Sequence, residues 1–383
     1  MSAPDRQWRI RFVDDLNDEL VDRTAAFFDE YFPGVFGETC DPELFRWKLG
    51  PSNPAGQGIL AVAIADDAAI AGVMSATMKR MTIGARSVAG SETGDTFTHP
   101  DFRRSGRAAE AAPGTTTDHY LNRSVFGRLV DEVSRALADQ AVEIVYSTPN
   151  DQSRPGYCRR GGYEVAPTAS ARSWHCPQSS LFADRLPGRI GQVAFAAFDA
   201  LRSKSRRRLK TGESMTTISL RRDTPTPIFE TIDRLWQSCP PGENVVLVQD
   251  GDWIRHRYAL HPSQSYDLHL VGGTDRPNAF AISRTITRSH GATTRCLTEW
   301  SPSLSIDGRR FSELLFMMVE NARDVDTVSA WTDQRPGTWI RMVRAGFIPI
   351  NSVPVVLGCN DLGRQVIDQA IPFPLPIGWS DNV

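Results

Sequence analysis

The chain of 383 residues is long enough for two domains, because domains average about 150 residues. Its 40% hydrophobic and 23% charged residues exclude a disordered protein, and its net charge of −2 excludes a general attraction for nucleic acid or an anionic membrane. The first residues are too charged for a secretory signal, and no apolar run reaches the roughly 18 residues of a membrane helix. We therefore expect a cytoplasmic protein without an integral membrane segment and without a nucleic-acid partner.

The first half predicts alternating helices and strands from its apolar periodicity. In chain order these are a helix over 20–32, strands over 59–64 and 70–78, a long extended run over 85–98, a helix with an apolar stripe over 121–137, a strand over 143–148 and a short helix that ends at Gly161. Six scattered cysteines form no C-x-x-C pair and the histidines show no ligand spacing, so we expect reduced thiols and no metal.

The second half repeats the first in outline. Phe45–Leu49 corresponds to Ile254–Tyr258, and the Asp-Gln run that begins at Asp151 matches the one that begins at Asp333. Further strands are predicted over 266–271, 279–286 and 327–331, with a helix over 311–323. We interpret the pattern as a tandem duplication of one α/β unit, with domains over 1–175 and 216–383.

The connecting segment, 176–215, carries an apolar stripe that ends in the basic cluster Lys204–Lys210. This pattern favours an amphipathic connecting helix with a solvated basic end. Peripheral contact with a membrane is the alternative interpretation.

The segment Arg103–Ala108 fits the pattern Arg/Gln-x-x-Gly-x-Gly/Ala, between a predicted strand and a predicted helix. A pyrophosphate needs several backbone N–H donors at once, and a turn that leads into a helix N-terminus supplies them. Gly106 allows close approach of the backbone, and the arginines add charged hydrogen bonds. A basic solvated turn would look similar, so the pattern depends on its context.

That context, from the strand through the loop, helix, strand, Pro-Asn and Gly-Tyr, resembles the GCN5-related N-acetyltransferase (GNAT) family. The resemblance covers about 16–165 with the loop and, in weaker form, about 227–357 without it. It implies an α/β (α+β) fold of two tandem GNAT-like domains, each a mixed, mostly antiparallel twisted sheet flanked by helices, of which only the first binds acetyl-CoA. The cofactor-binding residues that it implies are the backbone of Phe97, Thr98 and His99, the loop residues Arg103, Arg104, Ser105, Gly106, Arg107 and Ala108, and Asn150.

Acyl transfer to an amine needs a base, because an alkyl ammonium has a pKa of about 10.4. Asp95 and Glu92 are the candidates on the extended run before the loop. Three residues apart, they point to opposite faces of a regular strand unless a bulge intervenes, as it often does in the family. The departing thiolate needs an acid, and the family's tyrosine position holds Cys158 here. Tyr157 stands one residue earlier, about 100° around a helix, and is either the acid or a packed aromatic residue.

A second departure from the family is the insertion over 107–116, which contains Pro113 and Gly114. It is either a lid over the ligand or a displacement of the helix N-terminus that weakens donor binding.

The sequence therefore predicts an acetyl-CoA-dependent N-acetyltransferase that acts by direct attack of a primary amine on the thioester. The acceptor is expected to be a small molecule, with an amino sugar suggested by association, and a homodimer is left open. The alternatives are an O-acyl or aminoacyl transferase on the same fold, or a non-catalytic binding or scaffold protein.

Overall fold

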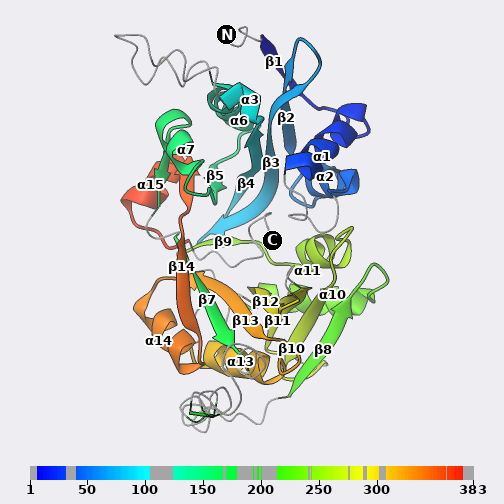
Figure 1. Cartoon of the computed structure of the whole chain (residues 1–383). Helices are drawn as coiled ribbons and strands as arrows, with labels where there is room; N and C mark the ends of the chain where they lie inside the picture. Colours follow the sequence, from blue (N-terminus) through cyan, green and yellow to red (C-terminus); the bar gives the residue numbers. More distant parts are fainter. Residues whose placement is uncertain are drawn as a thin grey trace.

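The computed structural model contains two sheets flanked by helices (Figure 1). It describes residues 7–31, 40–103, 124–166, 170–178, 214–239, 242, 244–274, 277–287, 291–301, 308–358 and 360–373, with isolated positions between 193 and 200. The phosphate-loop residues 104–108, the insertion over 107–116 and nearly all of the connecting segment lie outside the described residues.

The first sheet has the order β1-β2-β3-β4-β5-β15-β6, with β9 paired to β3. Only the β4–β5 pair is parallel among its described ladders. Its strands are β1 (Trp8–Phe12), β2 (Ile59–Ala65), β3 (Ile70–Ile83), β4 (Arg86–Thr98), β5 (Ile144–Ser147), β6 (Tyr163–Val165), β9 (Val245–Leu247) and β15 (Val356–Gly358).

The second sheet has the order β14-β7-β13-β12-β11-β10-β8. Again one described pair, β12–β13, is parallel and the others are antiparallel. Its strands are β7 (Ala171–Pro177), β8 (Met215–Leu220), β10 (Tyr266–Val271), β11 (Ala279–Thr287), β12 (Thr293–Trp300), β13 (Thr327–Asp333) and β14 (Ile348–Val353). The mixed, mostly antiparallel sheets that the family resemblance implied are confirmed.

Helices cover both faces of each sheet. They are α1 (Glu19–Tyr31), α2 (Pro42–Leu49), α3 (Pro100–Arg103), α6 (Val125–Asp139), α7 (Arg154–Arg160), α10 (Thr226–Gln237), α11 (Gly251–Ile254), the π-helical turn η1 (Arg255–Ala259), α13 (Gly308–Glu320), α14 (Pro336–Arg344) and α15 (Asp361–Asp368). The predicted apolar stripe of Leu129, Val133 and Leu137 lies on α6 and is buried against one face of the first sheet. Helices α1 and α2 pack on the opposite face.

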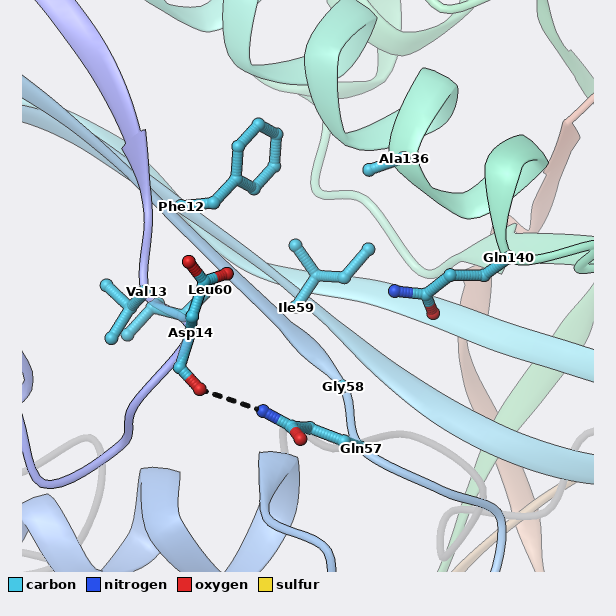
Figure 2. Close-up of a pocket in the computed structure, with 9 residues that line it drawn as sticks. All are labelled: Phe12, Val13, Asp14, Gln57, Gly58, Ile59, Leu60, Ala136 and Gln140. Carbon is cyan, nitrogen blue, oxygen red and sulfur yellow. Dashed lines mark hydrogen bonds between the residues drawn. The ribbon is translucent and has the colours of Figure 1, made fainter.

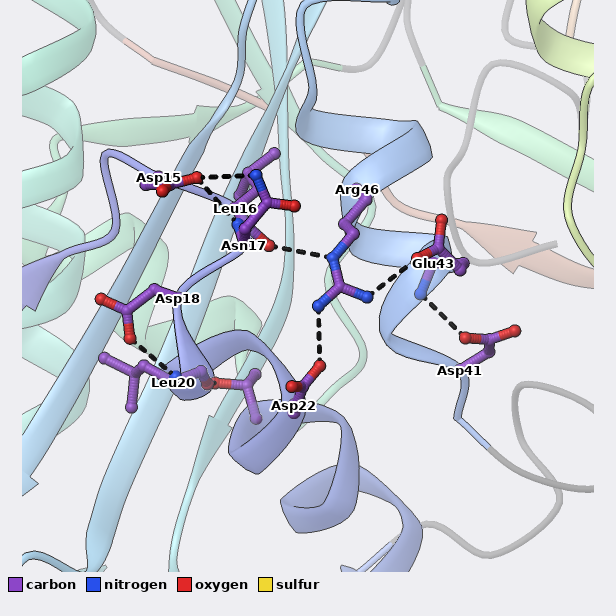
Figure 3. Close-up of polar contacts among 10 residues, drawn as sticks. Asp15, Leu16, Asn17, Asp18, Leu20, Asp22, Asp41, Glu43 and Arg46 are labelled. Carbon is purple, nitrogen blue, oxygen red and sulfur yellow. Dashed lines mark hydrogen bonds and ion pairs between the residues drawn. The ribbon is translucent and has the colours of Figure 1, made fainter.

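Arg46 ties α2 to α1 and to the chain before it (Figure 3). Its Nε donates to the carbonyl of Leu16 at 3.0 Å, and its other nitrogens reach Asp22 at 2.8 Å and Glu43 at 2.9 Å. Asp41 caps the start of α2 by accepting from the backbone of Glu43. These contacts fix the helix that carries Lys48, a residue important for the site.

The two sheets exchange strands, so they do not follow the continuous domain ranges predicted from the sequence. Strand β7, which begins in the first predicted domain and ends two residues past it, lies in the second sheet between β13 and β14. Strand β15, from the second predicted domain, lies in the first sheet between β5 and β6. The sequence pattern could not reveal this exchange. It gives the order of strands along the chain, and that order is the same whether each strand joins the sheet of its own half or the other sheet.

Equivalent segments of the two halves also touch. The Trp47 indole donates to the carbonyl of His256 at 2.9 Å and stacks on its ring, with the centroids 5.2 Å apart. These two residues occupy matching positions in the sequence repeat. The repeat is therefore accompanied by contact between corresponding surfaces.

Candidate active site

The feature that organises the site is an opening between β4 and β5. Their parallel pairing ends at Glu92 and Tyr146, after which β4 continues to Thr98 and β5 stops at Ser147. The Ser147 hydroxyl donates to the carbonyl of Thr93 at 2.8 Å just beyond the last pair. Beyond this point Thr93 and Asp95 are buried, whereas Gly94 and the stretch from Thr96 to Thr98 are half-exposed. A narrow extended ligand could therefore lie along β4 where its parallel neighbour has diverged.

A bulge interrupts β4 in this opening. Gly94 pairs with Ser75 and Phe97 pairs with Val73, so Asp95 and Thr96 together face the single residue between those two on β3. Asp95 has a φ of 43°, in the left-handed region that L-residues with side chains rarely adopt. Bulges free backbone N–H groups from the ladder, and strained backbone of this kind clusters at functional sites.

Asp95 is anchored by one of its two carboxylate oxygens. Its Oδ2 accepts hydrogen bonds from the Lys48 ammonium and, at 2.6 Å, from the Ser75 hydroxyl. The side chains of Lys48 and Asp95 are 4% and 1% exposed, so this ion pair is buried. The other oxygen, Oδ1, is buried with no hydrogen-bond partner among the described residues. A buried acceptor of this kind calls for a ligand or a water.

Glu92 lies on the same face of the sheet as Asp95. It is paired across the ladder with Thr77, and its Oε2 is 3.5 Å from the Nζ of Lys79, with both side chains fully buried. Because the bulge shifts the alternation of β4, both carboxylates face the side covered by α1 and α2. A regular strand would have separated them, and the bulge that the sequence analysis allowed for is the physical reason that they share one face.

Tyr157 reaches the opening from α7. Its hydroxyl is 2.8 Å from the hydroxyl of Thr96, and Ser147 and Thr93 lie within hydrogen-bonding reach. The ring packs edge-on against Phe126, at 5.4 Å between centroids. Burial raises the pKa of Tyr157, so the phenol is protonated at neutral pH. The neighbouring Cys158 is half-buried on the same helix, and burial raises the pKa of its thiol.

The predicted cofactor-binding stretch of β4 is half-exposed at the mouth of the opening. Arg103 turns back over it, with its Nε 2.8 Å from the carbonyl of Thr98 and its guanidinium 4.7 Å from the centroid of the Phe97 ring. The Nε2 of His99 is 2.6 Å from the Tyr31 hydroxyl. Arg104, Ser105, Gly106, Arg107 and Ala108 lie outside the described residues, so their role stays a prediction.

Asn150 follows β5 and shapes the turn into α7. Its Oδ1 accepts from the backbone N–H groups of Gln152 and Ser153 at 3.0 and 2.9 Å. This contact orients the helix that carries Tyr157. Whether the remaining amide N–H₂ contacts a cofactor stays a prediction.

Sequence reasoning missed Lys48 and Ser75. Lys48 precedes Asp95 by 47 positions, and no local pattern connects them. The only signal was the repeat, which aligns Lys48 with Arg257, another buried cation. Cys40 was also missed, and its burial beside Asp95 raises the pKa of its thiol to about 12, which argues against a nucleophilic thiolate.

The second half keeps the framework of the opening with different side chains. A register shift leaves Thr298 as an extra residue in β12, and the next residue, Glu299, is completely buried. Glu299 accepts from the Tyr258 hydroxyl, and burial raises its pKa. Trp253 is also buried, and the partly buried Trp331 packs against the same core.

A cavity of about 740 Å³ lies elsewhere, between the far end of α6 and the start of β2 (Figure 2). It is lined by Phe12, Val13, Asp14, Gln57, Gly58, Ile59, Leu60, Ala136 and Gln140. None of the predicted site residues is among them. In the described part of the chain, no three metal-ligating side chains gather, and each helix is too short or too polar to cross a bilayer.

Solved structures share this architecture. A GCN5-related N-acetyltransferase from Anabaena variabilis superposes with a TM-score of 0.56 at 15% identity, over 91% of this chain and 72% of that one. Saccharomyces cerevisiae N-myristoyltransferase with bound myristoyl-CoA and inhibitors gives 0.56 at 12% identity, over 93% and 85%. A probable N-acyltransferase from Enterococcus faecalis gives 0.54 at 11% identity, over 92% and 72%. Comparisons with protein-family models and with curated proteins find no match.

The chain therefore has the two-domain GNAT fold, as the sequence resemblance predicted. At these identities the likeness establishes the fold. The activity has to be argued from the site.

Proposed function

We propose that the protein is an acyl-CoA-dependent N-acyltransferase, with acetyl-CoA as the donor and a primary amine of a small molecule as the acceptor. The observation that carries the proposal is the placement of the Tyr157 hydroxyl in the opening between β4 and β5, 2.8 Å from the hydroxyl of Thr96, which forms the bulge together with Asp95. The named activities of the structural neighbours support acyl transfer from a CoA thioester. An amino sugar remains the proposed acceptor by association.

The residues fit an extended thioester ligand. The half-exposed backbone of β4 beyond the bulge offers groups for a pantetheine arm, and the bulge frees backbone N–H from the ladder for the oxygen of a tetrahedral intermediate. The loop over 103–108 would supply the pyrophosphate contacts expected from its sequence. These assignments place the thioester carbonyl near the bulge and its sulfur near Tyr157.

In the proposed reaction, the acceptor ammonium gives a proton to Asp95 through the free Oδ1, while Oδ2 stays anchored on Lys48 and Ser75. The amine nitrogen then bonds to the thioester carbon, and the electron pair of the C=O bond moves to oxygen. The electron pair then returns from oxygen and re-forms the C=O bond as the C–S bond breaks, and the Tyr157 hydroxyl donates its proton to the departing sulfur. The new amide nitrogen gives its second proton, through solvent, to the Tyr157 oxygen, and Asp95 releases its proton to solvent. Glu92, three residues before Asp95 on β4 and 3.5 Å from the Lys79 Nζ, is the alternative base.

Donor binding is tested by calorimetric titration of acetyl-CoA. The wild type is expected to bind acetyl-CoA with a micromolar Kd. Thr96→Trp places a large side chain in the opening, so we expect this variant not to bind. Ser87→Trp is the matched control, because it adds the same side chain at an exposed position on the other end of β4. No binding of any acyl-CoA by the wild type would overturn the proposal and favour the non-catalytic scaffold.

Proton donation is tested with Tyr157→Phe and an amine panel, by following thiol release. General acid catalysis contributes about 10²–10⁴-fold, so kcat is expected to fall by that factor while acetyl-CoA affinity stays within twofold. Cys158→Ala is the control on the same helix and is expected to keep its rate. A Tyr157→Phe enzyme with wild-type kcat would remove Tyr157 from the reaction. Parallel assays with alcohols distinguish O-acyl transfer.

A further inference from the structure

Two segments cross between the sheets and pair with each other on the way. The first runs from β6 into β7, and the second runs from β14 into β15; Figure 1 shows β14 and β7 side by side. Val356 pairs with Val165 in the first sheet, and Val353 pairs with Ala171 in the second. Each segment therefore starts in one sheet and ends in the other.

The exchange is reciprocal, and each exchanged strand lies inside its host sheet. At the crossing, the Ala166 N–H donates to the carbonyl of Val355 at 3.0 Å, and both residues are completely buried. On β7, Trp174 and Cys176 are part of the core of the second sheet. Removal of an interior strand would expose two unpaired sheet edges and open a core, so neither sheet is complete without the other half of the chain.

For the candidate site, the important strand is β15. It lies on the side of β5 away from β4, with Leu357 opposite Tyr146 and Val356 opposite Ser147. Ser147 is the position at which β5 has already left the ladder with β4. One wall of the opening is therefore fastened by a strand from the C-terminal half.

Side-chain contacts add to the backbone exchange. Arg80 of β3 pairs with Asp250 at 2.7 Å, and the Lys79 ammonium lies 5.2 Å from the centroid of the Trp253 ring. Strand β9 of the C-terminal half pairs with the end of β3, from Met81 to Ile83. These contacts join the halves at a second place, remote in sequence from the crossing.

We propose that the two halves form one intertwined folding unit that does not depend on the covalent connection through residues 179–213, and that the C-terminal half is a structural part of the acyl-CoA groove. The second clause rests on the proposed function, whereas the first does not. The second half then acts on donor binding through β15.

The first clause is tested in the full chain with a recognition sequence for a specific protease inserted after residue 200. After cleavage, the two pieces are expected to co-elute on gel filtration at the position of the intact 42.4 kDa chain. Acetyl-CoA affinity is expected to stay within twofold of the uncut protein. Pieces that separate, each folded by circular dichroism, would overturn the intertwined unit.

The second clause is tested in the uncut chain with Val356→Pro, since proline removes a backbone N–H from a strand that has neighbours on both sides. We expect at least a tenfold loss of acetyl-CoA affinity. Ile350→Pro is the matched control, because Ile350 is exposed on the edge strand β14 and has no partner in its ladder to β7. Wild-type affinity in Val356→Pro would overturn the role of β15. Absence of binding in the wild type would instead refute the proposed function and leave the co-elution result intact.

Discussion

Breaking the ion pair between Lys48 and Asp95 is expected to destabilise the protein strongly. The two side chains are 4% and 1% exposed, so removing one charge leaves the other in a medium that solvates it poorly. Loss of one partner of a buried pair costs about 3–5 kcal/mol. We expect Lys48→Met and Asp95→Asn each to lower the free energy of unfolding by about that amount. Asparagine suits position 95, because it tolerates the positive φ.

The double variant separates the pair from its surroundings. With both charges gone, no unpaired charge is buried, so the combined loss should fall short of the sum of the single losses by at least about 2 kcal/mol. Urea denaturation at pH 7.5, followed by tryptophan fluorescence, measures all three values. Arg46→Met on the same helix is the control: its ion pair with Asp22 is partly solvated, so about 1 kcal/mol is expected.

Additive single losses, or single losses near that of Arg46→Met, would refute the buried pair. The double variant also informs the mechanism. If it folds with near-native stability but transfers no acyl group, Asp95 is needed for more than support of the fold.

Two further predictions concern the second sheet and the contact between halves. Burial lowers the pKa of His269 from 6.5 to about 4. Between pH 6.5 and pH 4 the unfolded chain therefore binds a proton at this residue that the folded state does not, so the free energy of unfolding falls as the pH is lowered through this range. At pH 4.5 this costs about 2.5 kcal/mol relative to pH 7.5, and urea titrations should show His269→Asn to be less acid-sensitive by that amount; equal acid sensitivity would contradict the lowered pKa. Trp47→Ala removes the indole that stacks on His256, so we expect a loss of about 2 kcal/mol in the free energy of unfolding, measured by the same assay; a change below about 0.5 kcal/mol would show that the stack does not hold the halves together.

The sequence predicted the local elements that carry strong periodicity. The stripe of α6 and the extended run of β4 depend on neighbouring residues, so a pattern within one segment is enough to find them. The predicted helix over 20–32 is observed as α1, Glu19–Tyr31, within the described residues. The resemblance supplied the order of these elements and therefore the fold.

Non-local features could not be predicted in this way. The bulge at Asp95 depends on how β4 meets β3, and the residues around it do not distinguish a bulged strand from a regular one. The pairing of Lys48 with Asp95 depends on the docking of α2 over the sheet. The strand exchange depends on which sheet receives β7 and β15. A fold with the exchange and a fold without it have the same order of elements along the chain, so that order does not distinguish them.

The exchanged strands also set the order of events while the protein is made. Ser147 of β5 cannot pair with Val356 of β15 until that residue has been synthesised, 209 positions later along the chain. At about 5–20 residues per second, a ribosome needs roughly 10–40 s to cover that distance. During this interval the nascent N-terminal half presents β5 and β6 without the strand between them. Until the C-terminal residues emerge, these two edges are open to pairing with other chains.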